Sequence, residues 1–185
     1  RFEVCGHKYM DISDYGYGVS LLNDCKYGYN VDNGTMKLSL FKCATYPDPD
    51  ADKGEHVFTY SLFPHAGNYR DAGTVQLAYE INNPLKASLI DKQNGTLPEE
   101  YSFVSCDKDN FIVETVKKAE NSDDIIVRGY ESYNKGTSVT LNFGFDVKEA
   151  ILCDLLERDV EKLTVENNSV SFKAKPFEII TIKVK

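Results

Sequence analysis

The stretch HVFTYSLF, residues 56–63, carries the pattern that decides the fold. Phe58, Tyr60 and Leu62 recur at every second position, and alternate side chains of a β-strand point to the same face of a sheet. The same period of two recurs in SVTLNF, residues 138–143, and the segments between such runs are rich in Gly, Asn, Asp and Pro. The sequence therefore predicts an all-β protein.

One segment, RDAGTVQLAYEINNPL at residues 70–85, departs from this pattern. Its apolar residues also alternate, but it contains the helix formers Gln, Leu, Ala and Glu in close succession. Asp71 is an acidic residue suited to a helix start, and Asn-Asn-Pro at residues 82–84 is a strong stop signal. We therefore predict one short helix near residues 71–81.

The chain is predicted to contain two β modules. Residues 82–102 form its least periodic and most turn-rich stretch, which is typical of a domain boundary. We place the first module at residues 1–97 and the second at residues 98–185.

Three dipeptides that begin with asparagine are predicted to form turns. They are Asn-Gly at residues 33–34, Asn-Gly at residues 94–95 and Asn-Asn at residues 167–168. All three also match the glycosylation acceptor pattern, but Asn-Gly is a strong hairpin signal. We expect unglycosylated turns at these positions.

Composition excludes several classes of function. The formal net charge is −8, and the sequence has no basic stripe that could neutralise phosphates. Both observations argue against nucleic-acid binding. No apolar run is long enough to span a bilayer, so no membrane partner is expected. The five cysteines form no CxxC motif, which favours free thiols in a reducing cytosol and predicts a cytoplasmic protein. Because the chain opens at Arg1 in an extended pattern, we expect it to continue a longer protein.

Candidate catalytic and metal-binding groups are few. The acids between Asp48 and Asp52 offer calcium ligands, but the run lacks the glycine and closing glutamate of an EF-hand and is predicted to be a solvated turn. Glu55, His56 and His65 could form an acid/base or metal site, although nothing in their spacing fixes a geometry. The sequence contains no nucleotide-binding or serine-nucleophile motif.

Four sequence strings connect the chain to a known enzyme family. YGYGVSLLNDCKYGY at residues 15–29 and PDPDADKGEHVFTY at residues 47–60 lie in the first module. RGYES at residues 128–132 and LLERDVEKL at residues 155–163 lie in the second. Together they resemble the C-terminal β region of α-mannosidases of glycoside hydrolase family 38, especially its bacterial and cytosolic branch. The resemblance covers nearly the whole chain.

The resemblance implies an architecture and partners. Residues 1–97 are expected to be the last part of a galactose-mutarotase-like β-supersandwich, and residues 98–185 a small C-terminal β-sandwich. The family's zinc ion and catalytic aspartates belong to an N-terminal catalytic domain, so no catalytic residue, metal ligand or cofactor is expected in this chain. The implied partners are that domain and its α-mannoside substrate, and a homo-oligomer is left open. The first module is expected to expose apolar surface or an open sheet edge.

A candidate substrate-binding loop also follows from the resemblance. In distant family members, the segment that matches residues 13–18 contains an arginine and projects toward the mannose subsite. This chain has tyrosines and glycines there instead; a tyrosine can stack on a sugar and hydrogen-bond to it, and a glycine lets the backbone approach a ligand. We expect the acid and amide that end the following strand to reach the same rim. The candidate residues are Asp14, Tyr15, Gly16, Tyr17, Asn23 and Asp24. A purely structural turn is the alternative for each.

Two functions of other classes compete with this interpretation. A self-standing carbohydrate-binding or interaction module would use the tyrosines of residues 15–29 as an exposed stacking platform. An aldose-epimerase-like enzyme of the mutarotase fold would use Glu55, His56 and His65 as its acid and bases.

Overall fold

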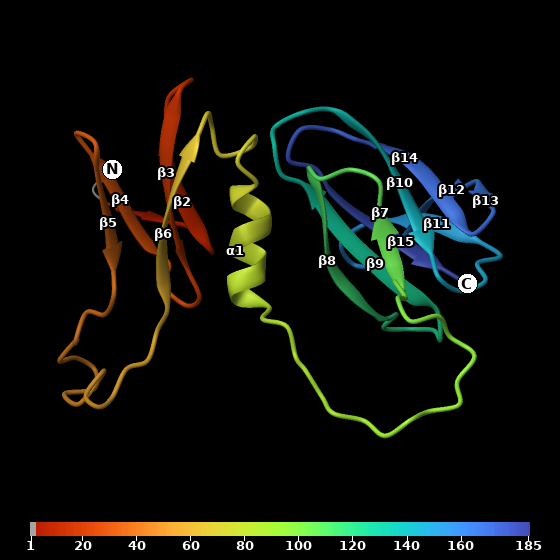
Figure 1. Ribbon diagram of the computed structural model, residues 1–185, viewed down its shortest axis with the longest axis horizontal. Coiled ribbons are helices and arrows are strands. Elements are labelled where there is room, and N and C mark those ends of the chain that lie inside the picture. The colour runs from red at the N-terminus through yellow and green to blue at the C-terminus, as the bar shows by residue number, and fades with distance from the viewer. Residues whose placement is uncertain (1–2) are drawn as a thin grey trace. The chain divides into compact units, whose positions relative to one another are not determined.

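The structure is a computed structural model that describes residues 3–185. It divides into two compact units, Arg1–Leu89 and Ile90–Lys185. Both units consist of β-sheets, and the helix α1, Thr74–Asn82, belongs to the first (Figure 1). The all-β prediction with one short helix is thus confirmed. The predicted module boundary at residues 97/98 lies further along the same segment, which contains no helix or strand between α1 and β7.

The first unit contains two three-stranded antiparallel sheets. One sheet has the order β1-β4-β5, and the other has the order β2-β3-β6. Between them lies a small apolar cluster of Met10, Leu21 and Tyr29, against which Met36 and Leu38 pack. The strands are β1 Val4–Cys5, β2 Tyr9–Ser13, β3 Tyr17–Asn23, β4 Gly28–Asp32, β5 Thr35–Ser39 and β6 Tyr60–Ala66.

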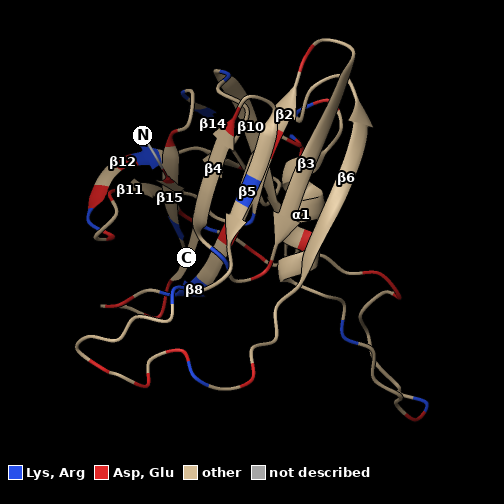
Figure 2. Ribbon diagram, turned by 90° about the vertical axis from the view of Figure 1, so that its left-hand side faces the viewer, with Lys and Arg blue, Asp and Glu red and all other residues tan. Residues whose placement is uncertain are grey.

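Helix α1 packs on the other face of the β2-β3-β6 sheet (Figure 2). Val75 and Ala78 are each only 1% exposed, and this spacing of three residues explains why a helix forms where alternation would have suited a strand. The helix begins three residues later than Asp71, the predicted start, because Gly73 has a left-handed φ of 70° and lies outside helical geometry. The Asp71 carboxylate accepts a hydrogen bond from the Asn68 amide at 2.6 Å in the preceding turn. None of the described residues lies in a helix long and apolar enough to cross a membrane.

The second unit is a β-sandwich of a four-stranded and a five-stranded sheet. The strand orders are β13-β14-β10-β7 and β12-β11-β15-β9-β8. Val139, Leu141 and Phe143 of β10 point into one buried core, as their alternation predicts. The strands are β7 Val104–Cys106, β8 Phe111–Lys118, β9 Ile125–Glu131, β10 Thr137–Phe143, β11 Ala150–Cys153, β12 Asp159–Leu163, β13 Val165–Glu166, β14 Ser169–Ala174 and β15 Ile179–Val184.

The buried carboxylate of Glu131 hydrogen-bonds to loops of the second unit. Glu131 is 0% exposed and accepts hydrogen bonds from the Asn110 amide at 2.8 Å and from the backbone N–H groups of Tyr133, Lys135 and Phe177 at 2.7, 3.1 and 3.0 Å. Burial alone would raise the pKa of Glu131, but these four donors outweigh it and lower that pKa.

Two of the three predicted turns form hairpins. Asn33 and Gly34 have φ values of 48° and 74° between β4 and β5, and Asn167 and Asn168 have values of 49° and 59° between β13 and β14. Two consecutive positive φ angles characterise the type I′ turn that suits the twist of a hairpin. Residues 94–95 form no hairpin, because no strand flanks them in the long connection after α1.

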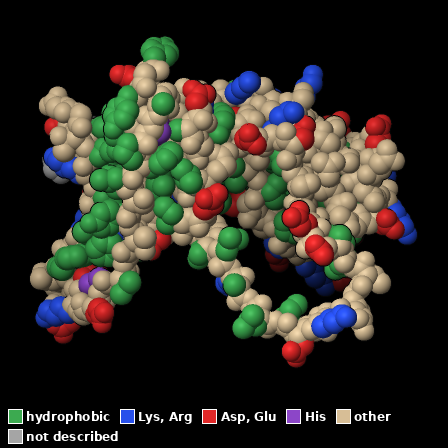
Figure 3. All heavy atoms as spheres, viewed as in Figure 1, with side chains coloured by type: hydrophobic (Ala, Val, Ile, Leu, Met, Phe, Trp, Pro, Cys, Tyr) green, Lys and Arg blue, Asp and Glu red, His purple; other side chains and the backbone are tan. Residues whose placement is uncertain are grey.

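The first unit leaves part of its sheet surface uncovered. Tyr17, Tyr60 and Leu62 lie on the face of the β2-β3-β6 sheet opposite α1, the same face that packs on the other sheet through Leu21. They nevertheless remain 58%, 59% and 64% exposed. The strands β3 and β6 contain no Lys, Arg, Asp or Glu, and Figure 3 shows apolar side chains gathered over this unit. The apolar exposure expected of the first module is therefore present.

Candidate functional site

The loop between β2 and β3 is a tight turn held by its own aspartate. The Asp14 Oδ1 atom accepts hydrogen bonds from the backbone N–H groups of Gly16 at 2.7 Å and Tyr17 at 2.9 Å. The hydrogen bond from Gly16, followed by that from Tyr17, lowers the pKa of Asp14. Asp14 is therefore an ionised residue that shapes the turn, with its second oxygen unused by these contacts.

Two tyrosine rings project from this turn. Tyr15 is fully exposed, at 104%, and Tyr17 is 58% exposed. The carbonyl oxygen of Gly16 accepts a hydrogen bond from the Gly67 N–H at 3.1 Å, which ties the loop to the chain that follows β6. The loop thus presents exposed aromatic rings on a backbone that is anchored at three points, an arrangement suited to contact with a sugar ring.

A groove of about 690 Å³ adjoins the loop. Residues of β2, β3, β5 and β6 line it, and Asp14 and Tyr17 of the loop are among them. Most of its lining is apolar, since Val19, Leu21 and Leu62 contribute to it. The groove therefore lies between the two sheets of the first unit, beside their apolar cluster, and is not a polar sugar pocket.

The structure does not bring Asn23 and Asp24 to this loop. They follow the opposite end of β3, which at about 3.3 Å per residue places them roughly 20 Å from Tyr17. Asn23 is 1% exposed, donates to the Tyr29 hydroxyl and accepts from the Lys26 N–H at 2.7 Å. Asp24 accepts from the Thr59 N–H at 3.0 Å. The expectation of a shared rim was wrong, because a seven-residue strand separates its two ends.

The other sequence candidates are also dispersed. The imidazole of His56 hydrogen-bonds to the Asp52 carbonyl at 2.7 Å and stacks on Phe41, whereas His65 is buried against Asp11. The alternative grouping of Glu55 with both histidines therefore does not form. Asp50 pairs with Lys53, as a solvated turn requires.

Candidate metal ligands are scattered among the residues that the structure describes. Within residues 3–185, no group of three or more His, Cys, Asp or Glu side chains is placed to hold a metal ion. Neither the calcium alternative at residues 48–52 nor a zinc site has the necessary ligands here.

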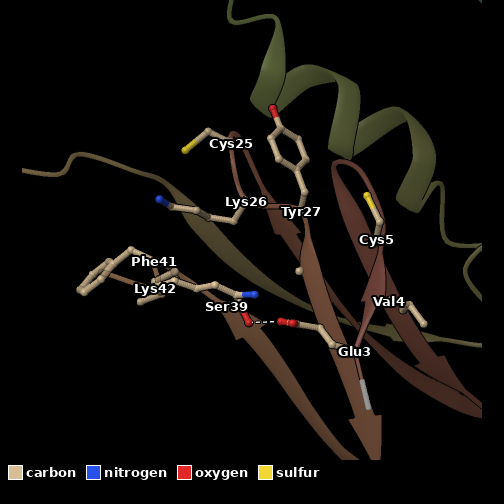
Figure 4. A pocket seen from close by; sticks show the side chains of 11 residues that line it. Glu3, Val4, Cys5, Cys25, Lys26, Tyr27, Ser39, Phe41 and Lys42 are labelled. Carbon is tan, nitrogen blue, oxygen red and sulfur yellow. Dashed lines mark hydrogen bonds between the residues drawn. The ribbon is translucent and has the colours of Figure 1, made fainter. Parts of the chain in front are cut away.

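A second groove, of about 500 Å³, lies on the β1-β4-β5 sheet (Figure 4). Figure 4 shows Lys26, Phe41 and Lys42 at one side of it and the Ser39 hydroxyl hydrogen-bonded to Glu3. Its side chains include no nucleophile paired with a base and no opposed pair of carboxylates, so it offers no catalytic arrangement.

Sequence reasoning missed a polar network beneath the tyrosine loop. Asp11 of β2 contacts His65 of β6 at 2.8 Å and Ser20 of β3 at 2.7 Å, and Ser20 contacts Thr74 of α1 at 2.8 Å. Asp11 and His65 are 54 residues apart in the chain, so no local spacing indicated the pair.

Two family models match the chain. The model described as "Glycosyl hydrolases family 38 C-terminal domain" matches residues 1–50, and "Glycosyl hydrolases family 38 C-terminal beta sandwich domain" matches residues 110–182.

Curated relatives match over the whole chain but are far longer. The chain is 40% identical to human "Alpha-mannosidase 2C1" over 98% of its own length, and 38% identical to "Alpha-mannosidase G" of Dictyostelium discoideum over 99%. It spans only 18% and 17% of those two proteins.

A solved structure shares the fold. It is a protein of glycosyl hydrolase family 38 from Enterococcus faecalis, with a TM-score of 0.79 and 21% identity, and the similarity covers 99% of this chain and 22% of that one. The two matched models, the relatives and the fold agree, and the chain belongs to glycosyl hydrolase family 38, whose C-terminal β domains it contains.

Proposed function

We propose that this chain is the non-catalytic C-terminal β region of an α-mannosidase that acts on terminal α-linked mannose. In that role it scaffolds an N-terminal catalytic domain and lends the Asp14–Tyr17 loop to the sugar subsite. The observation that carries the proposal is the match of nearly the whole chain to less than a fifth of several α-mannosidases.

The geometry of the loop supports a role in substrate binding. Tyr15 contributes nothing to the core, yet the turn that presents it is fixed by Asp14. An exposed ring on a preorganised backbone loses little conformational entropy on binding, and Gly16 lets a ligand approach the main chain. Stacking on the ring and a hydrogen bond to the phenol would both favour a pyranose.

The uncovered face of the first unit supports a role as scaffold. Large exposed apolar patches mark interaction surfaces, and here Tyr60 and Leu62 sit on a strand without charged residues. We propose that the catalytic domain, or the rest of the β-supersandwich to which residues 1–97 belong, covers this face. Residues 98–185 form the separate terminal sandwich.

The zinc ion of the family is proposed to reside in the catalytic domain, since the described residues of this chain lack a ligand set for it. A cytoplasmic location is proposed from the cysteines, all five of which are free thiols.

A second candidate is a self-standing carbohydrate-binding module. The exposed rings of Tyr15 and Tyr17 favour it, because they are available in the chain alone. Titration of the 185-residue chain with methyl α-mannoside, followed by the NMR signals of both tyrosines, distinguishes the two. Saturable binding at low millimolar concentration favours the module, and its absence favours the shared subsite.

The proposed function is tested by hydrolysis of an aryl α-mannoside. The chain alone should show no turnover, whereas the polypeptide that joins it to a family 38 catalytic domain should be active. Deleting the residues of this chain from that polypeptide should abolish activity or soluble folding. Turnover by the isolated chain, or full activity after the deletion, would contradict the proposal.

A further inference from the structure

The polar network beneath the tyrosine loop joins every strand of its sheet. The Asp11 carboxylate accepts hydrogen bonds from the Ser13 hydroxyl at 2.6 Å, the Ser20 hydroxyl at 2.7 Å and the His65 Nε2–H at 2.8 Å. Ser13 is the last residue of β2, and Ser20 and His65 lie on β3 and β6. The side chains of Asp11 and His65 are only 7% and 2% exposed, so this hydrogen bond is sheltered from water.

From this geometry we propose that the Asp11–His65 pair is a positioning element that holds the Asp14–Tyr17 loop in its sugar-contacting shape. The proposal rests on the function proposed above for that loop. The contacts of both residues lie on the strands that carry the turn, so both act through its backbone.

The His65 ring supports the loop at Gly18. A Cβ atom at position 18 would lie 2.4 Å from His65 Cε1 and 2.5 Å from Ser13 Cβ, far closer than such atoms approach. Only a glycine therefore allows the ring to lie directly against the residue that follows Tyr17. The Ser13 contact with Asp11 holds the other side of the turn.

A second tie comes from the end of β6. The Gly67 N–H donates to the Gly16 carbonyl at 3.1 Å, two residues beyond His65. The position of β6 relative to β2 and β3 therefore sets where Gly16 lies, and the Asp11–His65 contact links the two outer strands across β3.

Burying His65 costs free energy, because one of its ring nitrogens has no hydrogen-bond partner within the described residues. This atom is Nδ1, which is buried. A buried polar atom without a partner costs free energy, so a leucine of similar size would pack more favourably if the site had no other role. The arrangement fits a proton held on Nε2 and directed at Asp11, which fixes the orientation of the ring.

The test uses the 185-residue chain and backbone NMR order parameters. His65→Leu removes the donor, His65→Gln restores an N–H near the Nε2 position, and Val75→Ala is a control that weakens the same unit at a residue 1% exposed without touching the network. We expect the order parameters of Gly16 and Tyr17 to fall from above about 0.8 to below about 0.6 in His65→Leu only. His65→Gln should recover most of the rigidity, and exchange of the Gly67 amide should follow the same order.

Gly18→Ala provides an independent variant should His65→Leu not fold. Its added Cβ atom pushes the His65 ring away from the turn, while the Asp11 and His65 side chains keep their chemistry. Unchanged loop order parameters in the folded variants, or an equal change in Val75→Ala, would overturn the positioning role. In the α-mannosidase, His65→Leu should lower kcat/KM about tenfold and His65→Gln should recover it. A loosened loop with unchanged kcat/KM would leave the mechanical link intact and overturn the sugar role of the loop, so the two failures are distinct.

Discussion

The two units differ in how completely they cover their own apolar surface. In the second unit the two sheets enclose a core in which Val170 and Ile182 are 0% exposed. In the first unit the two sheets share a much smaller buried cluster, and Leu62 remains 64% exposed. The second unit therefore buries its apolar surface through its own contacts, whereas the first leaves apolar side chains exposed on its sheet.

Removing the buried carboxylate should have the largest effect and should be confined to the second unit. Glu131→Ala leaves the Asn110 amide and three backbone N–H groups without their acceptor. Each such buried donor costs about 1–3 kcal/mol, so we expect a loss of at least about 3 kcal/mol in the free energy of unfolding. Urea denaturation measures it, with Glu161→Ala on the exposed strand β12 as control. A variant within about 1 kcal/mol of the parent would show that the network is dispensable.

Truncating one apolar side chain in each unit should reveal the difference in how much stability their burial provides. Ile182→Ala removes a fully buried side chain and should cost about 2–5 kcal/mol. Leu62→Ala, on the open face of the first unit, should cost less than about 0.5 kcal/mol in the chain alone. Comparable losses at both positions would mean that the first unit covers its own sheet after all.

The second unit should also lose stability in acid through Glu131. Burial would raise the pKa of Glu131, but its hydrogen bonds lower it below the unfolded value. Its contribution to stability is therefore complete above the ordinary glutamate pKa of about 4.3 and is lost as the pH falls through the lowered folded pKa. Unfolding curves measured between pH 7 and pH 2 should show this loss, and Glu131→Gln should flatten it. An equally steep curve in that variant would assign the acid sensitivity to other groups.

Local patterns predicted the elements but not their distant contacts. The alternation in β10 and the Asn33-Gly34 turn were readable because strand period and hairpin chemistry act over a few residues. Asp71 lies before the helix because Gly73, with a φ of 70°, separates it from the first helical residue. Residues 94–95 had turn chemistry but no strands to join.

The site shows the same limit. The projection of Tyr15 from its loop agrees with what the family resemblance implied, while the placement of Asn23 failed because β3 separates it from the turn. The pairing of Asp11 with His65 depends on the registers of β2 with β3 and of β3 with β6, which no single segment encodes. Long-range strand pairing is what the sequence pattern leaves undetermined.

The central claim, that the open unit lends a tyrosine to a sugar subsite, is tested most directly by Tyr15→Ala in the α-mannosidase that carries this chain. Tyr27→Ala, at a tyrosine that is 50% exposed elsewhere in the same unit, is the matched control. Losing a stacking face and a hydrogen bond should cost about 1–3 kcal/mol in transition-state binding. We therefore predict a fall of about ten- to a hundredfold in kcat/KM for an aryl α-mannoside, with the free energy of unfolding unchanged and the control near the parent value. A Tyr15→Ala enzyme with unaltered kcat/KM would contradict the account and leave the loop as a turn without a ligand.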